Sequence, residues 1–200
     1  LRRQRQMCIR DSSITAFPEG SVMFPNEPIV TVKAPIIECS IIETYLLLSM
    51  NFNSLVATKT NRIVRTAGDR LVMEFGARRA QGADASIRGA RAAYIGGAPV
   101  TSNTYSAKKY GYKPAGTMAH SWVQAFPSEY DAFKTYAKVY PENCILLIDT
   151  YDTIHSGLPN AMRVFKEVLE PLGLTGGVRI DSGDLAYLSL IHISEPTRQA

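Results

Sequence analysis

From Gly68 onward the sequence alternates between short apolar runs and segments with helical periodicity, and this alternation limits the possible folds more than any other feature. The predicted strands are 71–75, 144–149 and 177–181, with a further strand ending the run "AAYIGG" at 92–97; the predicted helices are 84–93, 102–110, 128–139 and 158–172. Strands that alternate with helices of this length form right-handed βα units, which build a parallel sheet or a barrel. We therefore expect an α/β fold.

The sequence before Gly68 has a different pattern. "SVMF" at 21–24 and "PIVTVK" at 28–33 predict two short strands on either side of a Pro-Asn turn. Between 40 and 66 apolar residues recur at helical spacing, and the polar stretch 51–54 indicates a break between two helices.

Both ends of the chain depart from these patterns. "QRQMCIRDS" near the start and "LIHISEPTRQA" at the finish resemble translated read-through of a DNA sequencing adapter. We therefore interpret 1–12 and 190–200 as artefactual tails. On this interpretation the native sequence runs from about 13 to about 189 and is a fragment of a longer protein, and neither Cys8 nor His192 has a function.

Composition excludes several classes of protein. A hydrophobic content of 46% with 20% charged residues is typical of a globular domain. Residues 1–12 carry a net charge of +3 of the total +4, so the nearly neutral remainder gives no indication of nucleic-acid binding. The longest apolar run, 41–50, is interrupted by Glu43 and is shorter than the roughly 20 residues of a membrane span. We expect neither nucleic acid nor a membrane as a partner.

The three cysteines and the N-terminal end bear on the cellular compartment. The cysteines are scattered and lack CxxC spacing, which argues against a disulfide framework and against a zinc site. No apolar stretch of the kind found in a secretory signal follows the basic residues at the start. A reducing, cytoplasmic location fits these features.

Polar side chains follow the predicted strands, and in βα barrels the carboxyl ends of the strands form the active-site face. Phe75 is followed by Arg78 and Arg79, and an aromatic ring beside a guanidinium suits a planar anion. Residues 101–103, Thr-Ser-Asn, begin a predicted helix, where N–H groups favour anions. Taken singly, the first segment is better explained as a surface arginine pair beside a core phenylalanine, and the second as an ordinary helix cap.

The second group of candidates surrounds one histidine. His120 stands in "GTMAHSW", and carboxylates and an arginine follow the strands at 144–149 and 177–181; these are Asp149, Asp152, Arg179, Asp181 and Asp184. By itself His120 could be a packed core residue, and the aspartates could be helix caps. In combination, an imidazole, carboxylates and guanidiniums suit phosphoryl or phosphoribosyl chemistry, because they can accept a phosphoryl group and neutralise phosphate charge.

The order and spacing of several motifs resemble the nicotinate phosphoribosyltransferase family. The motifs are "EFGARRAQG", "TSN", "GTMAHSW", "DTYDTIHSGLPNA" and "GVRIDSGDLAYLS", and "FPEGSVMFPNEPIVTVKAPIIECSIIETYLL" also looks like the family's N-terminal region. The resemblance implies that 13–68 is part of an N-terminal α/β domain with linking helices. It also implies that 69–189 is the first part of an irregular, TIM-like βα barrel.

The resemblance implies an activity in NAD synthesis. Ribosyl phosphate is transferred from phosphoribosyl pyrophosphate to the ring nitrogen of nicotinate, which forms nicotinate mononucleotide and pyrophosphate. In the family, ATP transiently phosphorylates a histidine that matches His120, and ATP hydrolysis is coupled to product formation. The matching positions make Asp149 the residue that orients His120, and make Asp181 the residue that holds ribose hydroxyls or Mg²⁺.

The remaining matched positions are expected to bind substrate. Phe75 would stack on the pyridine ring, with Arg78 beside the anionic groups, and Arg179 would contact phosphate or the carboxylate. Further contacts are expected from Thr117, Ser182 and Gly183. Ser102 stands where the related nicotinamide enzyme has an aspartate, and a neutral residue there favours nicotinate because a carboxylate would repel it.

The family also implies partners and an incomplete site. Its members are homodimers that use ATP as co-substrate with Mg²⁺, and an aromatic residue from the extreme N-terminus completes the neighbouring subunit's site. We expect that segment to be missing here, together with the half that follows the "RIDSGD" strand, which contains the remaining barrel strands and a Gly-rich phosphate-binding loop. We therefore expect the 200-residue chain to be inactive by itself.

Other functions remain open at this stage. A nicotinamide-specific enzyme differs at the position of Ser102, and "GTMAHS" with "RIDSGD" argues against quinolinate phosphoribosyltransferase. A haloacid-dehalogenase-like phosphatase requires DxD spacing, whereas Asp149 and Asp152 are spaced DxxD. A non-catalytic barrel fragment used as a binding module predicts that replacing His120 changes only stability.

Overall fold

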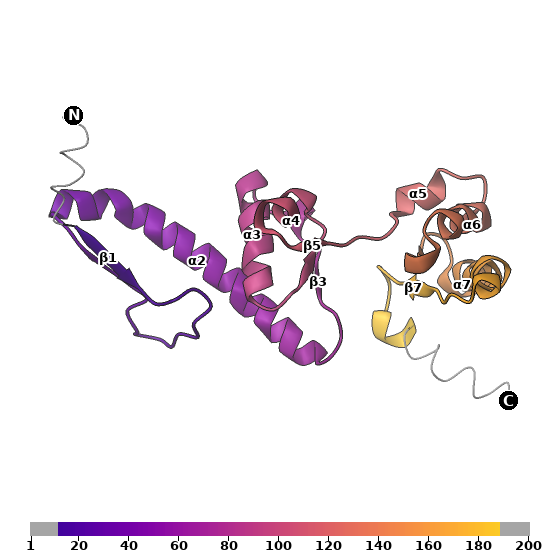
Figure 1. Cartoon of the computed structure of the whole chain (residues 1–200), viewed down its shortest axis with the longest axis horizontal. Helices are drawn as coiled ribbons and strands as arrows, with labels where there is room; N and C mark the ends of the chain where they lie inside the picture. Colours follow the sequence, from indigo (N-terminus) through magenta and orange to yellow (C-terminus); the bar gives the residue numbers. More distant parts are fainter. Residues whose placement is uncertain (1–11, 189–200) are drawn as a thin grey trace. The chain divides into compact units, whose positions relative to one another are not determined.

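The computed structural model describes residues 12–188, which divide into two compact units at Gly116 and Thr117 (Figure 1). Most of the predicted tails, with Cys8 and His192, lies outside the described residues. Within residues 12–188 the structure has no helix with the length and hydropathy that a membrane crossing requires.

The first unit begins with an antiparallel hairpin of β1 (Ser13–Ala16) and β2 (Val30–Lys33). The predicted Pro-Asn turn is present, and Asn26 has the left-handed φ of 69° that asparagine tolerates. The strand predicted at 21–24 is wrong, because that segment is irregular and 13–16 pairs with β2 instead. Residues 21–24 are flanked by Gly20 and Pro25, and neither residue supports a strand ladder.

The helix α2 (Ile36–Ala67) is continuous for 32 residues and ends at Gly68. The predicted break at 51–54 is wrong. No glycine or proline occurs within the helix, and the Asn53 side chain donates to the carbonyl of Ser49, 2.7 Å away, instead of ending the helix. The backbone of Gly96, at the end of the next helix, approaches α2 so closely that a Cβ there would lie 2.6 Å from the carbonyl oxygen of Ala57.

Three short parallel strands follow in the order β3-β4-β5. The elements are β3 (Met73–Glu74), the 3₁₀ turn η1 (Ala77–Arg79), α3 (Ala83–Ile95), β4 (Val100–Thr101), α4 (Thr104–Tyr110) and β5 (Lys113–Pro114). The strand predicted at the end of "AAYIGG" is wrong. Small alanines let α3 bury its face and continue to Ile95, so a Gly-Gly turn follows and the strand begins only at Val100.

The second unit has two parallel strands and a set of helices. They are α5 (His120–Gln124), α6 (Glu129–Val139), η2 (Pro141–Asn143), β6 (Ile145–Leu147), the π-helical η3 (Thr153–Gly157), α7 (Leu158–Val164), the π-helical η4 (Phe165–Leu169), η5 (Glu170–Leu172) and β7 (Gly177–Arg179). The core packs α6, α7 and η4 against β6, with Phe133, Leu146, Ile148 and Leu169 fully buried. The predicted parallel βα pattern is therefore found in both units.

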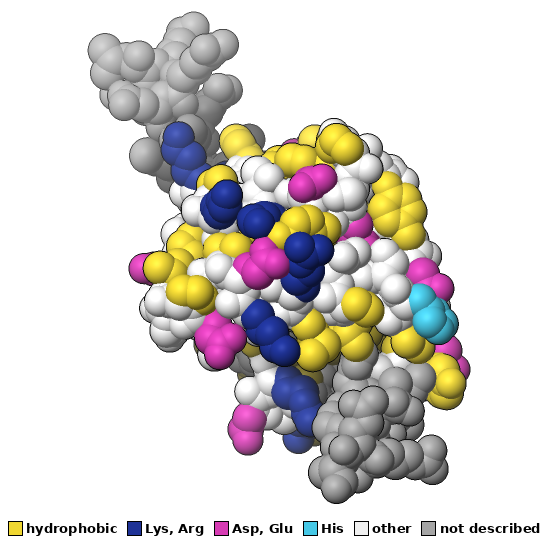
Figure 2. All heavy atoms as spheres, turned by 90° about the vertical axis from the view of Figure 1, so that its right-hand side faces the viewer, with side chains coloured by type: hydrophobic (Ala, Val, Ile, Leu, Met, Phe, Trp, Pro, Cys, Tyr) yellow, Lys and Arg dark blue, Asp and Glu magenta, His cyan; other side chains and the backbone are white. Residues whose placement is uncertain are grey.

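The surface charge is mixed in sign. Figure 2 shows Asp and Glu side chains beside a broken row of Lys and Arg side chains. Glu167 of η4 accepts from Arg163 Nε of α7 at 2.8 Å and lies 3.1 Å from Lys134 Nζ of α6. Neighbouring charges of opposite sign reduce the field that a uniformly basic face would present.

Gly157 tests the packing that supports β6. A Cβ at this position would lie 1.9 Å from the carbonyl oxygen of Ile148, and φ is −60°, so the constraint is steric rather than conformational. We expect Gly157→Ala to lower the free energy of unfolding by about 2 kcal/mol or more, although alanine is the better helix former. Urea unfolding measures this change.

Gly116→Ala is the matched control. A Cβ there meets nothing within 4 Å, so the stability should be unchanged or slightly raised. Equal stabilities for the two variants would contradict the close approach of Gly157 to Ile148.

Candidate functional site

The site in the second unit begins where β6 and β7 end. Both strands run in parallel, and the ladder continues past β6 because the Ile148 N–H donates to the carbonyl of Arg179 at 3.1 Å. Asp149 and Asp181 each follow two residues after the last residue of their strand. The two carboxylates therefore lie at the same edge of the sheet, where α/β proteins bind ligands.

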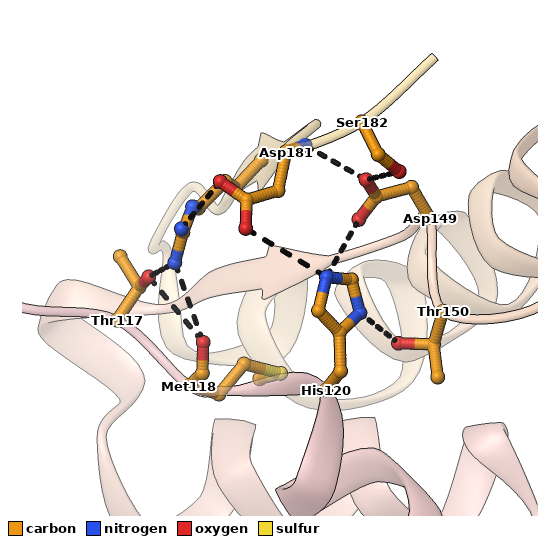
Figure 3. Close-up of polar contacts among 8 residues, drawn as sticks. Thr117, Met118, His120, Asp149, Thr150, Asp181 and Ser182 are labelled. Atoms are coloured by element: carbon orange, nitrogen blue, oxygen red, sulfur yellow. Dashed lines mark hydrogen bonds and ion pairs between the residues drawn. The ribbon is translucent and has the colours of Figure 1, made fainter. Parts of the chain in front are cut away.

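Asp149 is the most enclosed group of this edge, with a side chain 3% exposed. Its Oδ2 accepts the backbone N–H of Asp181 at 2.8 Å and the hydroxyl of Ser182 at 2.7 Å (Figure 3). Burial raises its pKa, but the two hydrogen bonds and nearby His120 outweigh burial and hold the pKa below the ordinary 3.8. The carboxylate is therefore ionised, and its buried Oδ1 has no hydrogen-bond partner.

His120 is the first residue of α5 and its ring points to both carboxylates (Figure 3). Its Nε2 lies 3.7 Å from Asp181 Oδ2 and 3.9 Å from Asp149 Oδ1. These distances exceed hydrogen-bond range, so the attraction is electrostatic. With a side chain 39% exposed, His120 is not a packed core residue.

Arg179 connects two parts of the site. Its guanidinium donates to the Thr117 hydroxyl and, at 2.7 Å, to Asp181 Oδ1. The guanidinium nitrogen that bonds Thr117 also donates to the carbonyl of Met118 at 3.5 Å. Arg179 thereby ties the extended chain that precedes His120 to the carboxylate that follows β7.

The structure brings most of the predicted residues of this unit together. They are Thr117, His120, Asp149, Arg179, Asp181 and Ser182. Gly183 follows with the left-handed φ of 82° that favours glycine. Asp152 and Asp184 instead accept backbone N–H groups at the starts of helical segments. Both therefore act as helix caps, which was the alternative explanation for these aspartates.

Thr150 is a site residue that sequence reasoning missed. Its Oγ1 lies 3.1 Å from His120 Nδ1. The sequence motif "LLIDTYDT" contains this threonine directly after Asp149, but only its carboxylates were considered as chemical groups. Its position directly after Asp149, a predicted catalytic carboxylate, could have identified Thr150 as a candidate.

The other predicted residues belong to the first unit. Phe75 directly follows β3, and Arg78 lies in η1. Ser102 directly follows β4, which pairs in parallel with β3. The Ser102 N–H donates to the carbonyl of Glu74 at 2.9 Å, and Asn103 caps α4 through Ser106 N. Ser102 is therefore not the helix cap.

Glu74 is a second residue that sequence reasoning missed. Its carboxylate accepts from Thr101 Oγ1 and from the backbone N–H of Gly76, each at 2.6 Å. It thereby fixes the turn that leads from β3 towards Arg78. An acidic residue inside the apolar run "LVMEF" was the available signal.

Parallel βα units with polar side chains gathered beyond the strand ends are typical of an α/β protein that binds a ligand at this edge. The sequence model described as the nicotinate phosphoribosyltransferase (NAPRTase) family matches residues 71–191. The chain belongs to this family, which confirms the resemblance drawn from the motifs.

Named relatives agree with this assignment. A nicotinate phosphoribosyltransferase of Bacillus subtilis is 50% identical over 171 residues, which cover 86% of this chain and 34% of the relative. The human protein of the same name is 31% identical over 228 residues, covering 90% of this chain and 42% of the relative. The chain thus spans about a third to two fifths of the length of these relatives.

Solved structures show the same likeness. The crystal structure of human nicotinic acid phosphoribosyltransferase matches with a TM-score of 0.79 at 29% identity, covering 99% of this chain and 50% of that chain. A nicotinate-nucleotide pyrophosphorylase from Pyrococcus furiosus matches with a TM-score of 0.66 at 24% identity, which shows a shared fold.

The hydrogen bond from Ser182 gives a testable pKa. The bond stabilises the ionised form of Asp149, so Ser182→Ala should raise the pKa of Asp149 toward its ordinary value. Because the folded-state pKa of Asp149 is lowered, the ionised carboxylate stabilises the fold above pH 3.8, and this stabilisation is lost as pH falls through the folded-state pKa. In Ser182→Ala the folded-state pKa is higher, so the stabilisation should be lost at a higher pH.

Titration of the Asp149 carboxyl by ¹³C NMR measures the pKa, and urea unfolding at several pH values measures the stability. Ser156→Ala is the control, because Ser156 donates to Glu129 and should leave the pKa of Asp149 unchanged. A pKa of Asp149 that is the same in Ser182→Ala and in the unaltered chain would contradict this account.

Proposed function

We propose that the full-length protein containing this chain is a nicotinate phosphoribosyltransferase of NAD biosynthesis. It transfers ribosyl phosphate from phosphoribosyl pyrophosphate to the ring nitrogen of nicotinate and releases pyrophosphate. The observation that carries the proposal is the cluster of His120, Asp149, Arg179 and Asp181, which lies within the residues that the family model matches.

The proposed role of His120 is to accept a phosphoryl group from ATP. A neutral ring nitrogen attacks the γ-phosphorus, a P–N bond forms, and the bond to the bridging oxygen breaks as ADP leaves. The ring becomes positively charged in this step. Asp149 and Asp181 lie within 4 Å of Nε2, and their negative charge supports the charged ring.

The proposed substrate contacts on this edge involve Arg179 and its neighbours. A guanidinium suits phosphate or carboxylate groups because it donates in a fixed fork. Thr117, Ser182 and Gly183 line the same segments and are proposed as further contacts. We place substrate binding here because the backbone is tied at several points, which limits its movement.

The donor set also suits Mg²⁺. Asp181 Oδ2 and the unpaired Oδ1 of Asp149 are carboxylate oxygens, which Mg²⁺ prefers. The described residues contain no group of three or more His, Cys, Asp or Glu side chains placed to hold a metal ion. Asp181 would therefore share the ion with substrate phosphates, and the bound ion would neutralise phosphate charge.

Acceptor recognition is assigned to the first unit. Phe75 would stack on the pyridine ring, and Arg78 would attract the carboxylate of nicotinate. Both follow β3, and Ser102 follows the neighbouring strand β4. The short parallel strands and following helices support the proposal that residues 69–189 form the first part of a βα barrel in the whole protein.

The whole protein is proposed to be a cytoplasmic homodimer, of which this chain alone is inactive. The described helix α2 has no buried residue, and large apolar side chains on it are exposed, including Ile36, Ile41 and Leu48. An apolar surface of this kind is typical of an interface. The activity is therefore to be measured in a protein of the relatives' length.

Replacement of His120 tests the central step. With phosphoribosyl pyrophosphate, Mg²⁺, ATP and nicotinate, His120→Ala should abolish the ATP-dependent stimulation of nucleotide formation, because the phosphoryl acceptor is lost. Nucleotide is measured chromatographically, and covalent phosphate is measured with γ-³²P-ATP.

His155→Ala is the matched control. Its side chain is 83% exposed and contacts only Asp152 among the described residues, so stimulation and labelling should persist. Full ATP stimulation in His120→Ala would refute the phosphohistidine, and failure of the unaltered protein to use nicotinate or nicotinamide would favour a non-catalytic module.

Ser102 tests acceptor choice. Ser102→Asp should reduce the kcat/KM for nicotinate by roughly a hundredfold, because a carboxylate facing the acid costs several kcal/mol. Nicotinamide should be affected much less. Ser102→Asn has nearly the same size as the aspartate without its charge, and it should retain the preference for nicotinate.

A further inference from the structure

We propose that Thr150 is a positioning residue for His120, a role that rests on the proposed function of His120 as phosphoryl acceptor. The Thr150 hydroxyl lies 3.1 Å from Nδ1, on the side of the ring away from the nitrogen that faces the carboxylates (Figure 3). Of the polar contacts to the ring, this one is within hydrogen-bond range. It therefore sets the angle of the ring.

The charges around the ring decide which nitrogen carries the proton. Asp149 and Asp181 face Nε2 from the ends of β6 and β7, and two negative charges favour an N–H there over a lone pair. In the neutral ring the lone pair is then on Nδ1, and the Thr150 hydroxyl donates to it. Thr150 thus stabilises one of the two tautomers.

Thr150 is well suited to hold this hydroxyl in place. Its backbone directly follows Asp149, whose carboxylate is fixed from Asp181 and Ser182. Two residues later, Asp152 caps η3 and fixes the chain again.

The tautomer matters for the proposed reaction, because a ring nitrogen attacks phosphorus only through a free lone pair. In this tautomer the lone pair is on Nδ1. In that step the N–P bond forms, the bond from the γ-phosphorus to the bridging oxygen breaks and ADP leaves. Thr150 keeps its own proton, and its side chain rotates to another rotamer as phosphorus approaches Nδ1. The hydroxyl therefore acts on the rate of phosphorylation rather than on the binding of nicotinate.

The first experiment is ¹⁵N NMR of the imidazole of His120 in the full 200-residue chain, at a pH where the ring is neutral. We expect Nε2 to be protonated and Nδ1 to be unprotonated. Thr150→Val removes the donor, so the Nδ1 signal should move downfield, whereas Thr150→Ser should restore it. A protonated Nδ1 in the unaltered chain, or identical spectra in the valine variant, overturns the proposal.

The second experiment measures nucleotide formation in the protein of the relatives' length. Thr150→Val should lower the ATP-dependent kcat by about tenfold or more with little change in the KM for nicotinate, and Thr150→Ser should recover most of the rate. Thr153→Val removes a hydroxyl three residues away that has no contact with His120 and is the matched control.

The two proposals fail in different ways. Unchanged kcat in Thr150→Val overturns the positioning role even when the unaltered protein is phosphorylated. If the unaltered protein takes up no phosphate on His120 but the valine variant shifts the Nδ1 signal, the proposed function fails and the hydrogen bond from Thr150 stands.

Discussion

The site in the second unit depends on the parallel pairing of β6 with β7. The pairing extends to Ile148 and Arg179, and beyond it the Asp181 N–H donates to the Asp149 carboxylate at 2.8 Å. The Asp149 carboxylate thus accepts the N–H that a backbone carbonyl would accept if the ladder continued. This fixes the spacing of the two carboxylates, so that one imidazole can face both of them.

A buried carboxylate with one unsatisfied oxygen is costly unless its other contacts compensate. Asp149 satisfies Oδ2 twice, which lowers its pKa despite burial, and leaves Oδ1 directed at His120. A group of this kind is typical of a functional site, where an interaction is completed only by a positively charged partner or a bound cation. The close packing of Gly157 against Ile148 holds the strand end that carries it.

Local patterns predicted much of the fold. The helices at 84–93 and 128–139 and the strands at 144–149 and 177–181 were found with small changes in their ends, because periodicity and capping residues act over a few positions. The errors at 21–24 and 92–97 arose because the pairing with 13–16 and the burial of α3 depend on the surrounding structure. The break predicted at 51–54 had a local signal against it, because α2 contains no glycine or proline.

The sequence by itself determined the α/β class, the family motifs and the placement of Phe75, His120, Asp149 and Asp181 at the ends of elements, because these follow from local periodicity and residue type. Only the tertiary structure decided which groups meet. The contact between His120 and Thr150 joins residues 30 positions apart, and the support of Asp149 by Ser182 joins residues 33 apart. Such contacts depend on which distant segments pair and pack together, such as β6 with β7, and local periodicity does not specify this.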